Sequence, residues 1–253
     1  MSHLASFDQF LLIWVAVAAV FFVSLFIIDA PYGRHARAGW GPQIPSTLGW
    51  VIMEAVSPIA MFVYFLKGDR EANVPALVFL GLWELHYINR AFIFPFRRRG
   101  GAKPMPLVVA LLAVGFNFGN TWVNGRWLFA LGPVRDTSWF LDPRFIVGVA
   151  LFLAGFWMNL DADAVLRNLR KPGETGYKIP HGGLYRFISA PNYFCEMIEW
   201  CGFALATWSL PGLTFAAWTI ANLLPRAIAN HRWYREKFPD YPPERRAVIP
   251  FLL

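Results

Sequence analysis

The stretch QFLLIWVAVAAVFFVSLFII, residues 9–28, decides the fold class of this chain. It carries no charge between Asp8 and Asp29, and about 20 such residues are enough for a helix to cross the hydrocarbon core of a bilayer. A cleaved signal peptide is the alternative, but it would have a shorter apolar run, a basic start and a small-residue cleavage site. We therefore predict a membrane-spanning helix.

The composition extends this prediction to the whole chain. Of the 253 residues, 57% are hydrophobic and only 15% are charged, whereas a soluble domain carries about a quarter charged residues. We predict one all-α, multi-pass integral membrane domain over residues 1–253, with the lipid bilayer as its partner. Apolar runs place seven transmembrane helices at 9–28, 48–66, 74–96, 106–123, 145–166, 191–209 and 213–225.

The basic residues predict the orientation. The net charge is +7, and most Lys and Arg lie after the first, third and fifth spans and in the tail. Because cytoplasmic loops are rich in Lys and Arg, the N-terminus is predicted outside and the C-terminus in the cytoplasm. This distribution explains the basic excess without a nucleic-acid partner. Cys195 and Cys201 lie on different faces of one predicted helix, so neither a disulfide nor a paired metal site is expected.

Polar side chains share faces of three predicted helices in the C-terminal half. They are Asn159, Asp163, Arg167 and Arg170 on one helix, Asn192, Glu196, Glu199 and Trp200 on the next, and Arg226, Asn230 and Tyr234 on the last. Basic residues alone would be explained by a cytoplasmic loop, but carboxyl groups inside membrane helices are costly and indicate a polar cavity. We expect a ligand that carries amides, hydroxyls and phosphates.

Glu54 and Tyr87 form a second candidate site. An isolated carboxyl among apolar neighbours is expected to stay protonated near neutrality and to donate a hydrogen bond, and a Tyr hydroxyl beside it would polarise a carbonyl. The alternative is that Glu54 forms a buried ion pair with Arg90 or His86. Spacing along the sequence does not decide between these two. The sequence has no HExxH motif and no GxGxxG motif after a strand, so neither a metal site nor a Rossmann site is expected.

Four segments resemble the steroid 5-alpha reductase family. They are LRKPGETGYKIPHGGLYRFISAPNYFCEMIEWCGFALATWSLP (169–211), RAIANHRWYREKFPDYPPERRAVIPFLL (226–253), LHYINRAF (85–92) and PYGRHA (31–36). The resemblance, close to the steroid type 2 branch, implies a seven-helix membrane enzyme. Such enzymes use NADPH to reduce the carbon 4–5 double bond of a hydrophobic 3-oxo-Δ4 steroid.

The resemblance also implies roles for individual residues. Glu54 and Tyr87 would hold the 3-oxo group while hydride passes to carbon 5, with solvent as the expected source of the proton at carbon 4. The positions expected to bind NADPH are Asn159, Asp163, Arg167, Arg170, Tyr177, Lys178, Asn192, Glu196, Arg226, Asn230, His231 and Tyr234. The expected gate residues are Tyr32, Arg34, Arg90 and Lys103. Asn230 departs from the family, because animal members carry His there.

The implied organisation has two parts. Residues 1–105 would contribute the substrate-side helices and the gate, and residues 145–253 the cofactor site, which would face the cytosol. We expect a monomer in the inner membrane of a bacterium or the endoplasmic reticulum of a eukaryote. Three alternatives remain: a related reductase of enoyl or sterol double bonds, an isoprenylcysteine-type methyltransferase that uses S-adenosylmethionine, and a lipid transporter or scaffold.

Overall fold

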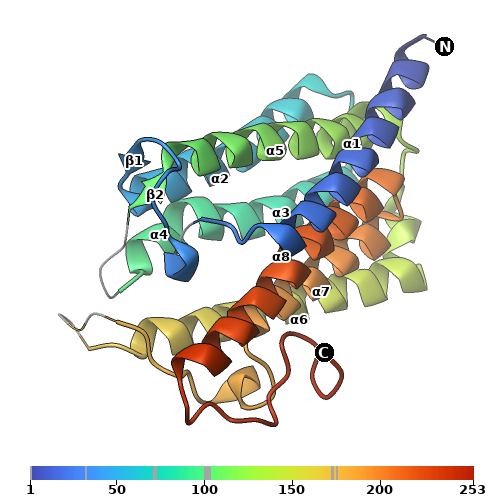
Figure 1. Cartoon of the computed structure of the whole chain (residues 1–253). Helices are drawn as coiled ribbons and strands as arrows, with labels where there is room; N and C mark the ends of the chain where they lie inside the picture. Colours follow the sequence, from blue (N-terminus) through green and yellow to red (C-terminus); the bar gives the residue numbers. More distant parts are fainter. Residues whose placement is uncertain (1, 32, 71–72, 100–103, 172–173, 175) are drawn as a thin grey trace.

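The computed structural model describes residues 2–31, 33–70, 73–99, 104–171, 174 and 176–253. Long helices dominate it (Figure 1). They are α1 (Ser2–Ile27), α2 (Ser46–Lys67), α3 (Val74–Ile88), α5 (Leu107–Arg126), α6 (Pro143–Asn168), α7 (Pro191–Thr207) and α8 (Leu210–Lys237). A π-helix (Asn89–Ile93) joins α3 to the short α4 (Phe94–Arg97), and a second one (Trp127–Leu131) extends α5. The strands β1 (Gln43–Ile44) and β2 (Met105–Pro106) pair antiparallel.

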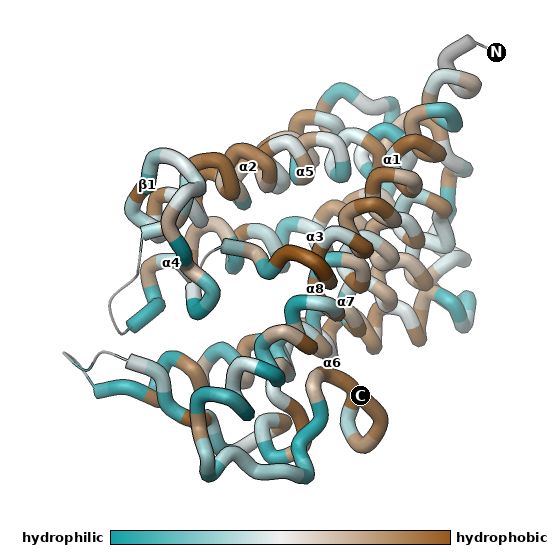
Figure 2. Tube along the Cα trace, viewed as in Figure 1, coloured by the Kyte–Doolittle hydropathy of each residue, from teal (hydrophilic) through white to brown (hydrophobic). Residues whose placement is uncertain are grey.

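The predicted helical fold class is confirmed. Four helical segments are long and apolar enough to cross a membrane, namely Ala5–Ile27, Ser46–Lys67, Leu107–Leu131 and Pro143–Asn168. Helix α7 has only 17 residues, fewer than the ~20 that span a bilayer. The 15 residues of α3 continue without a break through the π-helix (5 residues) and α4 (4 residues). Figure 2 shows α1 as mainly hydrophobic, whereas hydrophilic residues gather after α6 and near the end of α8. The full count of seven spans stays a prediction.

The helices form two groups that share an aromatic core. Helices α2, α3 and α5 lie together in one group, and α6, α7 and α8 lie in the other, with α1 running along α8 (Figure 1). Trp83 of α3 packs against Trp200 and Phe203 of α7 and Phe215 of α8, with ring centroids 5.2–5.5 Å apart. This cluster joins the two groups through the middle of the bundle.

Glycines allow α6 and α7 to pack unusually closely. A Cβ atom added at Gly202 of α7 would lie 2.4 Å from the backbone nitrogen of Phe152, and one added at Gly155 of α6 would lie 2.6 Å from the backbone nitrogen of Glu199. Small residues at such crossings let helix backbones approach within a membrane. The close crossing fixes the relative positions of the polar side chains on the two helices.

We expect Gly202→Leu to destabilise the protein. The added side chain would force α6 and α7 apart, and overpacking of this kind costs about 1–3 kcal/mol. Thermal unfolding in detergent measures the effect. Gly115→Leu is the matched control, because Gly115 is exposed on α5 with open space around its Cα. Equal melting temperatures for the two variants would contradict the close packing of α6 on α7.

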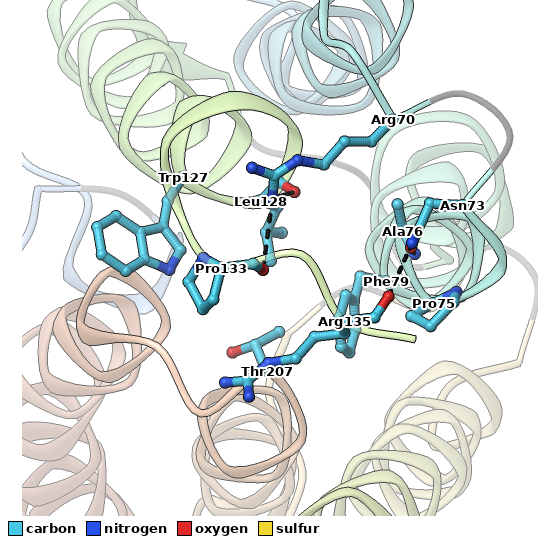
Figure 3. A pocket seen from close by; sticks show the side chains of 10 residues that line it. All are labelled: Arg70, Asn73, Pro75, Ala76, Phe79, Trp127, Leu128, Pro133, Arg135 and Thr207. Carbon is cyan, nitrogen blue, oxygen red and sulfur yellow. Dashed lines mark hydrogen bonds between the residues drawn. The ribbon is translucent and has the colours of Figure 1, made fainter. Parts of the chain in front are cut away.

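A small pocket lies at the end of the bundle where α2 and α5 finish (Figure 3). The guanidinium of Arg70 donates hydrogen bonds to the carbonyls of Leu128, Ala130 and Gly132 at 3.2, 2.8 and 2.7 Å, and so caps the π-helix after α5. The cavity beside it measures about 20 Å³, which is room for about one water molecule. This pocket is too small for a larger ligand.

Candidate functional site

A cavity of about 560 Å³ opens at the end of the bundle that carries β1 and α4. Its volume falls within the roughly 300–1,000 Å³ of small-molecule sites. Its lining comes from the loop after α1, from α4, from the starts of α2 and α7, and from the C-terminal parts of α6 and α8. Its basic side chains are Arg34, His35, Arg98, Arg99, Arg170 and Arg226. Such a concentration of guanidinium groups suits a ligand with several anionic oxygens.

Six of the residues predicted to form the cofactor site or its gate line this cavity. They are Arg34, Arg170, Tyr177, Asn192, Arg226 and Asn230. Arg226 donates to the Tyr193 hydroxyl at 3.2 Å, and the Asn230 amide oxygen lies 3.1 Å from Nε2 of His35. The structure thus brings residues from the loop after α1 next to residues of α7 and α8.

Arg34 has an unusual environment. Its guanidinium carbon lies 5.7, 5.1 and 4.6 Å from the ring centres of Tyr177, Trp233 and Tyr234. Its Nη1 atom is buried and has no hydrogen-bond partner among the described residues. A buried donor without a partner is costly, and an anionic ligand oxygen would satisfy it. Tyr32 and Lys103, which are also predicted gate residues, lie outside the described residues.

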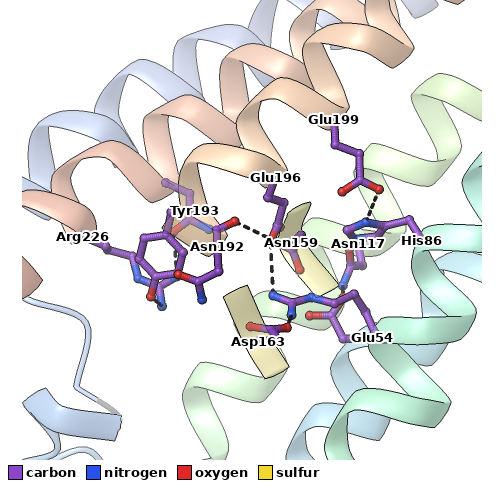
Figure 4. A network of polar contacts seen from close by, with 12 residues as sticks. Glu54, His86, Asn117, Asn159, Asp163, Asn192, Tyr193, Glu196, Glu199 and Arg226 are labelled. Atoms are coloured by element: carbon purple, nitrogen blue, oxygen red, sulfur yellow. Dashed lines mark hydrogen bonds and ion pairs between the residues drawn. The ribbon is translucent and has the colours of Figure 1, made fainter. Parts of the chain in front are cut away.

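A second polar group lies deeper in the bundle (Figure 4). Nη1 of Arg90 lies 3.3 Å from Asp163 of α6, and Nη2 lies 3.2 Å from Glu196 of α7. The Asn159 side chain donates to the backbone carbonyl of Asn192 at 2.8 Å. Arg90 was predicted as a gate residue, but it is only 8% exposed and lies within the π-helix, where it joins α6 and α7 to the other helix group.

Glu54 and Tyr87 are joined by a residue that the sequence reasoning missed. Nδ2 of Asn117, on α5, donates to Oε2 of Glu54 at 3.5 Å, and the Tyr87 hydroxyl donates to Oδ1 of Asn117 at 3.4 Å. Nδ1 of His86 lies 2.8 Å from Oε1 of Glu199, so His86 has a hydrogen-bond partner other than Glu54, and Arg90 forms its ion pairs with other acids. A polar amide inside an apolar helix could have marked Asn117 as a candidate site residue, but the sequence does not show which residues it contacts.

The remaining predicted residues lie elsewhere. Neither His231 nor Lys178 lines the cavity. Nδ1 of His231 is 2.6 Å from the Ser189 hydroxyl, which also contacts the Tyr241 hydroxyl. Lys178 pairs with Glu174 on the surface, and hydrogen bonding from Lys178 lowers the pKa of Glu174. Arg167 is half-buried near the end of α6, and Tyr234 is buried beside Arg34.

Comparison with known proteins gives consistent matches. The sequence model of a family described as 3-oxo-5-alpha-steroid 4-dehydrogenase matches residues 103–253. The 3-oxo-5-alpha-steroid 4-dehydrogenase 1 of Bos taurus is 45% identical over 94% of this chain and 93% of its own length. The same enzyme of Rattus norvegicus is 44% identical over 94% and 92%. Steroid 5-alpha-reductase DET2 of Gossypium hirsutum is 40% identical over 97% of both chains.

Proposed function

Because the chain belongs to the 3-oxo-5-alpha-steroid 4-dehydrogenase family and is a steroid 5-alpha reductase, we propose that it reduces the carbon 4–5 double bond of 3-oxo-Δ4 steroids with NADPH. One observation carries the proposal. The Glu54–Asn117–Tyr87 cluster lies beside an arginine-lined cavity, since Trp50, one helical turn before Glu54 on α2, lines that cavity. The group that we propose to bind the carbonyl and the cavity that we propose to bind phosphates would therefore be neighbours.

The residues around the cavity fit a phosphorylated dinucleotide. Arg34, Arg170 and Arg226 would hold phosphates, and the unpartnered Nη1 atom of Arg34 supports this role. Asn192, Asn230 and the Tyr177 hydroxyl offer hydrogen bonds to amide and ribose groups. When bound, the nicotinamide supplies the hydride for carbon 5.

The polar residues behind the cavity would support this site. Asn159 fixes the backbone carbonyl of Asn192, and Arg90 holds Asp163 and Glu196 close to the start of α7. In our proposal these residues orient the cavity wall, and Arg167 and Tyr234 complete its basic and aromatic surroundings. Lys178 and His231, whose hydrogen bonds go to Glu174 and Ser189, stay predicted cofactor residues outside the cavity lining.

Glu54 and Tyr87 would act on the 3-oxo group of the steroid. As hydride reaches carbon 5, negative charge develops on the 3-oxo oxygen. The Tyr87 hydroxyl and protonated Glu54 would donate hydrogen bonds to that oxygen in a site that excludes water, where such donors stabilise charge strongly. Aromatic rings of Trp83 and Trp200 pack around Tyr87 and keep its surroundings apolar. Protonation of carbon 4, with solvent as the proton source, completes the reaction.

The proposal includes seven spans, with the N-terminus outside and the cavity facing the cytosol. The basic residues around the cavity support this orientation, because positively charged residues concentrate on the cytoplasmic side. The relatives compared above carry type 1 and DET2 names, so they do not support the expected closeness to the type 2 branch.

Arg226→Ala is expected to weaken NADPH binding about 10- to 100-fold, because hydrogen bonds to charged groups contribute roughly 1.5–3 kcal/mol. Isothermal titration of the detergent-solubilised protein measures this. The control is Arg235→Ala, because Arg235 is exposed on the same helix and does not line the cavity. Equal dissociation constants for both variants would remove Arg226 from the cofactor site.

Ligand-induced stabilisation tests the proposed cofactor. A ligand that binds only the folded protein raises its melting temperature. We expect a rise with NADPH and none with S-adenosylmethionine. Oxidation of NADPH is then measured with 3-oxo-Δ4 steroids, enoyl-CoA thioesters and sterols. A response to S-adenosylmethionine alone, or turnover of thioesters but not of steroids, would replace the proposed function by one of the alternatives.

A further inference from the structure

We propose that Asn117 is a positioning residue that orients both Glu54 and Tyr87 for the substrate carbonyl. This inference rests on the proposed function. Asn117 is 4% exposed on α5, and its side chain is the link between Glu54 on α2 and Tyr87 on α3. Three helices therefore meet at one amide (Figure 4 shows Asn117 beside Glu54).

The direction of the amide is fixed by the backbone of α2. Nδ2 of Asn117 lies 2.6 Å from the carbonyl oxygen of Met53. A carbonyl only accepts, so the amide nitrogen must face it, and the amide oxygen must face the Tyr87 hydroxyl. The orientation of Asn117 thus follows from its hydrogen bonds.

This direction determines which atom of Glu54 can donate. The second N–H of Asn117 points to Oε2 of Glu54 at 3.5 Å, so Oε2 acts as an acceptor. In a protonated Glu54 this long contact favours the acid proton on Oε1, which has no hydrogen bond to the described residues. Asn117 thus favours Oε1 as the oxygen that donates to the substrate carbonyl.

The contact with Tyr87 has a complementary effect. At 3.4 Å, the hydrogen bond from the hydroxyl to Oδ1 of Asn117 is long and therefore weak. This hydrogen bond holds the Tyr87 hydroxyl in place before substrate binds. Because the bond is weak, the hydroxyl proton can turn to a substrate oxygen at a small cost in free energy. Other hydrogen bonds hold α2, α3 and α5 together nearby. The Ser57 and Thr121 hydroxyls lie 3.0 Å apart, and the Trp83 indole donates to Ser57. These three helices are therefore held together by contacts other than those of Asn117, and we propose that Asn117 orients the Glu54 and Tyr87 side chains.

The test is Asn117→Leu, which preserves the approximate volume and removes all three hydrogen bonds of the side chain, those with Met53, Glu54 and Tyr87. We expect kcat to fall about 100-fold, as for a misplaced reacting group, with NADPH affinity unchanged. Asn117→Ser fits without crowding, but the shorter side chain cannot reach both Glu54 and Tyr87, so it should show the same loss in kcat. This variant replaces Asn117→Leu in the test if the leucine variant does not fold. Asn124→Leu is the control, since Asn124 lies on the same face of α5 and its side chain bonds to Asn120.

A double-variant comparison separates positioning from general stability. If Asn117 acts through Tyr87, part of the loss in kcat is common to Asn117→Leu and Tyr87→Phe. The kcat of the double variant should then be at least about 10-fold higher than the value obtained by multiplying the two single fold-losses. Fully multiplicative losses, or a kcat for Asn117→Leu within 3-fold of the native value, would overturn the inference while leaving the proposed function intact. Failure of the native protein to reduce any 3-oxo-Δ4 steroid would overturn both.

Discussion

Glu54→Gln is expected to lower kcat for a 3-oxo-Δ4 steroid about 100-fold, the effect of weakening one donor to a developing oxyanion. The glutamine amide fits the same space, but it is a weaker donor than a protonated carboxyl. Glu54 lies in α2 and contacts Asn117, and it does not line the arginine-rich cavity. NADPH affinity should therefore be unchanged. Single-turnover kinetics and a separate NADPH titration measure the two quantities.

The matched control for this variant is Glu84→Gln. Glu84 lies on α3, and the hydrogen bonds of the Glu54 cluster go to residues other than Glu84. Its replacement should leave kcat unchanged. Native turnover by Glu54→Gln would remove Glu54 from the mechanism. A similar loss in both variants would mean that any change of an acid in these helices disturbs the enzyme.

Arg90→Met is expected to cause the largest loss of stability, about 3–5 kcal/mol, the usual cost of removing one partner from a buried ion pair. The variant leaves the carboxylates of Asp163 and Glu196 buried without their shared cation. It also removes the contacts of the guanidinium with the rings of Trp50 and Phe94 at 5.2 and 4.7 Å. Denaturant or thermal unfolding in detergent gives the magnitude.

A triple variant distinguishes stability from function. Adding Asp163→Asn and Glu196→Gln to Arg90→Met removes the uncompensated charges, so most of the lost stability should return. NADPH affinity should not return, because the groups that orient the start of α7 are gone. If Arg90→Met melts at the native temperature, the ion pairs do not hold the two helix groups together.

The positions of the helices could be predicted from the sequence because they depend on local hydropathy. All but the last residue of the run 9–28 lies within α1, and the polar faces of α6 and α7 follow the helical period. The pairing of Glu54 with Tyr87 was one of two alternatives that the residues left open, and the family resemblance favoured it. Periodicity places residues on one helix face, and it says nothing about which helices are neighbours.

The contacts between distant segments could not be predicted for the same reason. Arg90 could have paired with Glu54, Asp163, Glu196 or Glu199, and only the packing of α3 against α6 and α7 decides among them. The π-helix that carries Arg90 has no clear sequence signal, and the role of Asn117 depends on the backbone carbonyl of Met53. These features arise from tertiary structure.

The most direct measurement is isotope transfer by the purified protein. NADPH that carries deuterium on either face of nicotinamide carbon 4 is incubated separately with a 3-oxo-Δ4 steroid, and the product is analysed by mass spectrometry and NMR. We predict that one labelled form yields a steroid that is saturated between carbons 4 and 5 and holds one deuterium at carbon 5. A saturated product without that deuterium from either labelled form, or no NADPH-dependent product, would contradict the account.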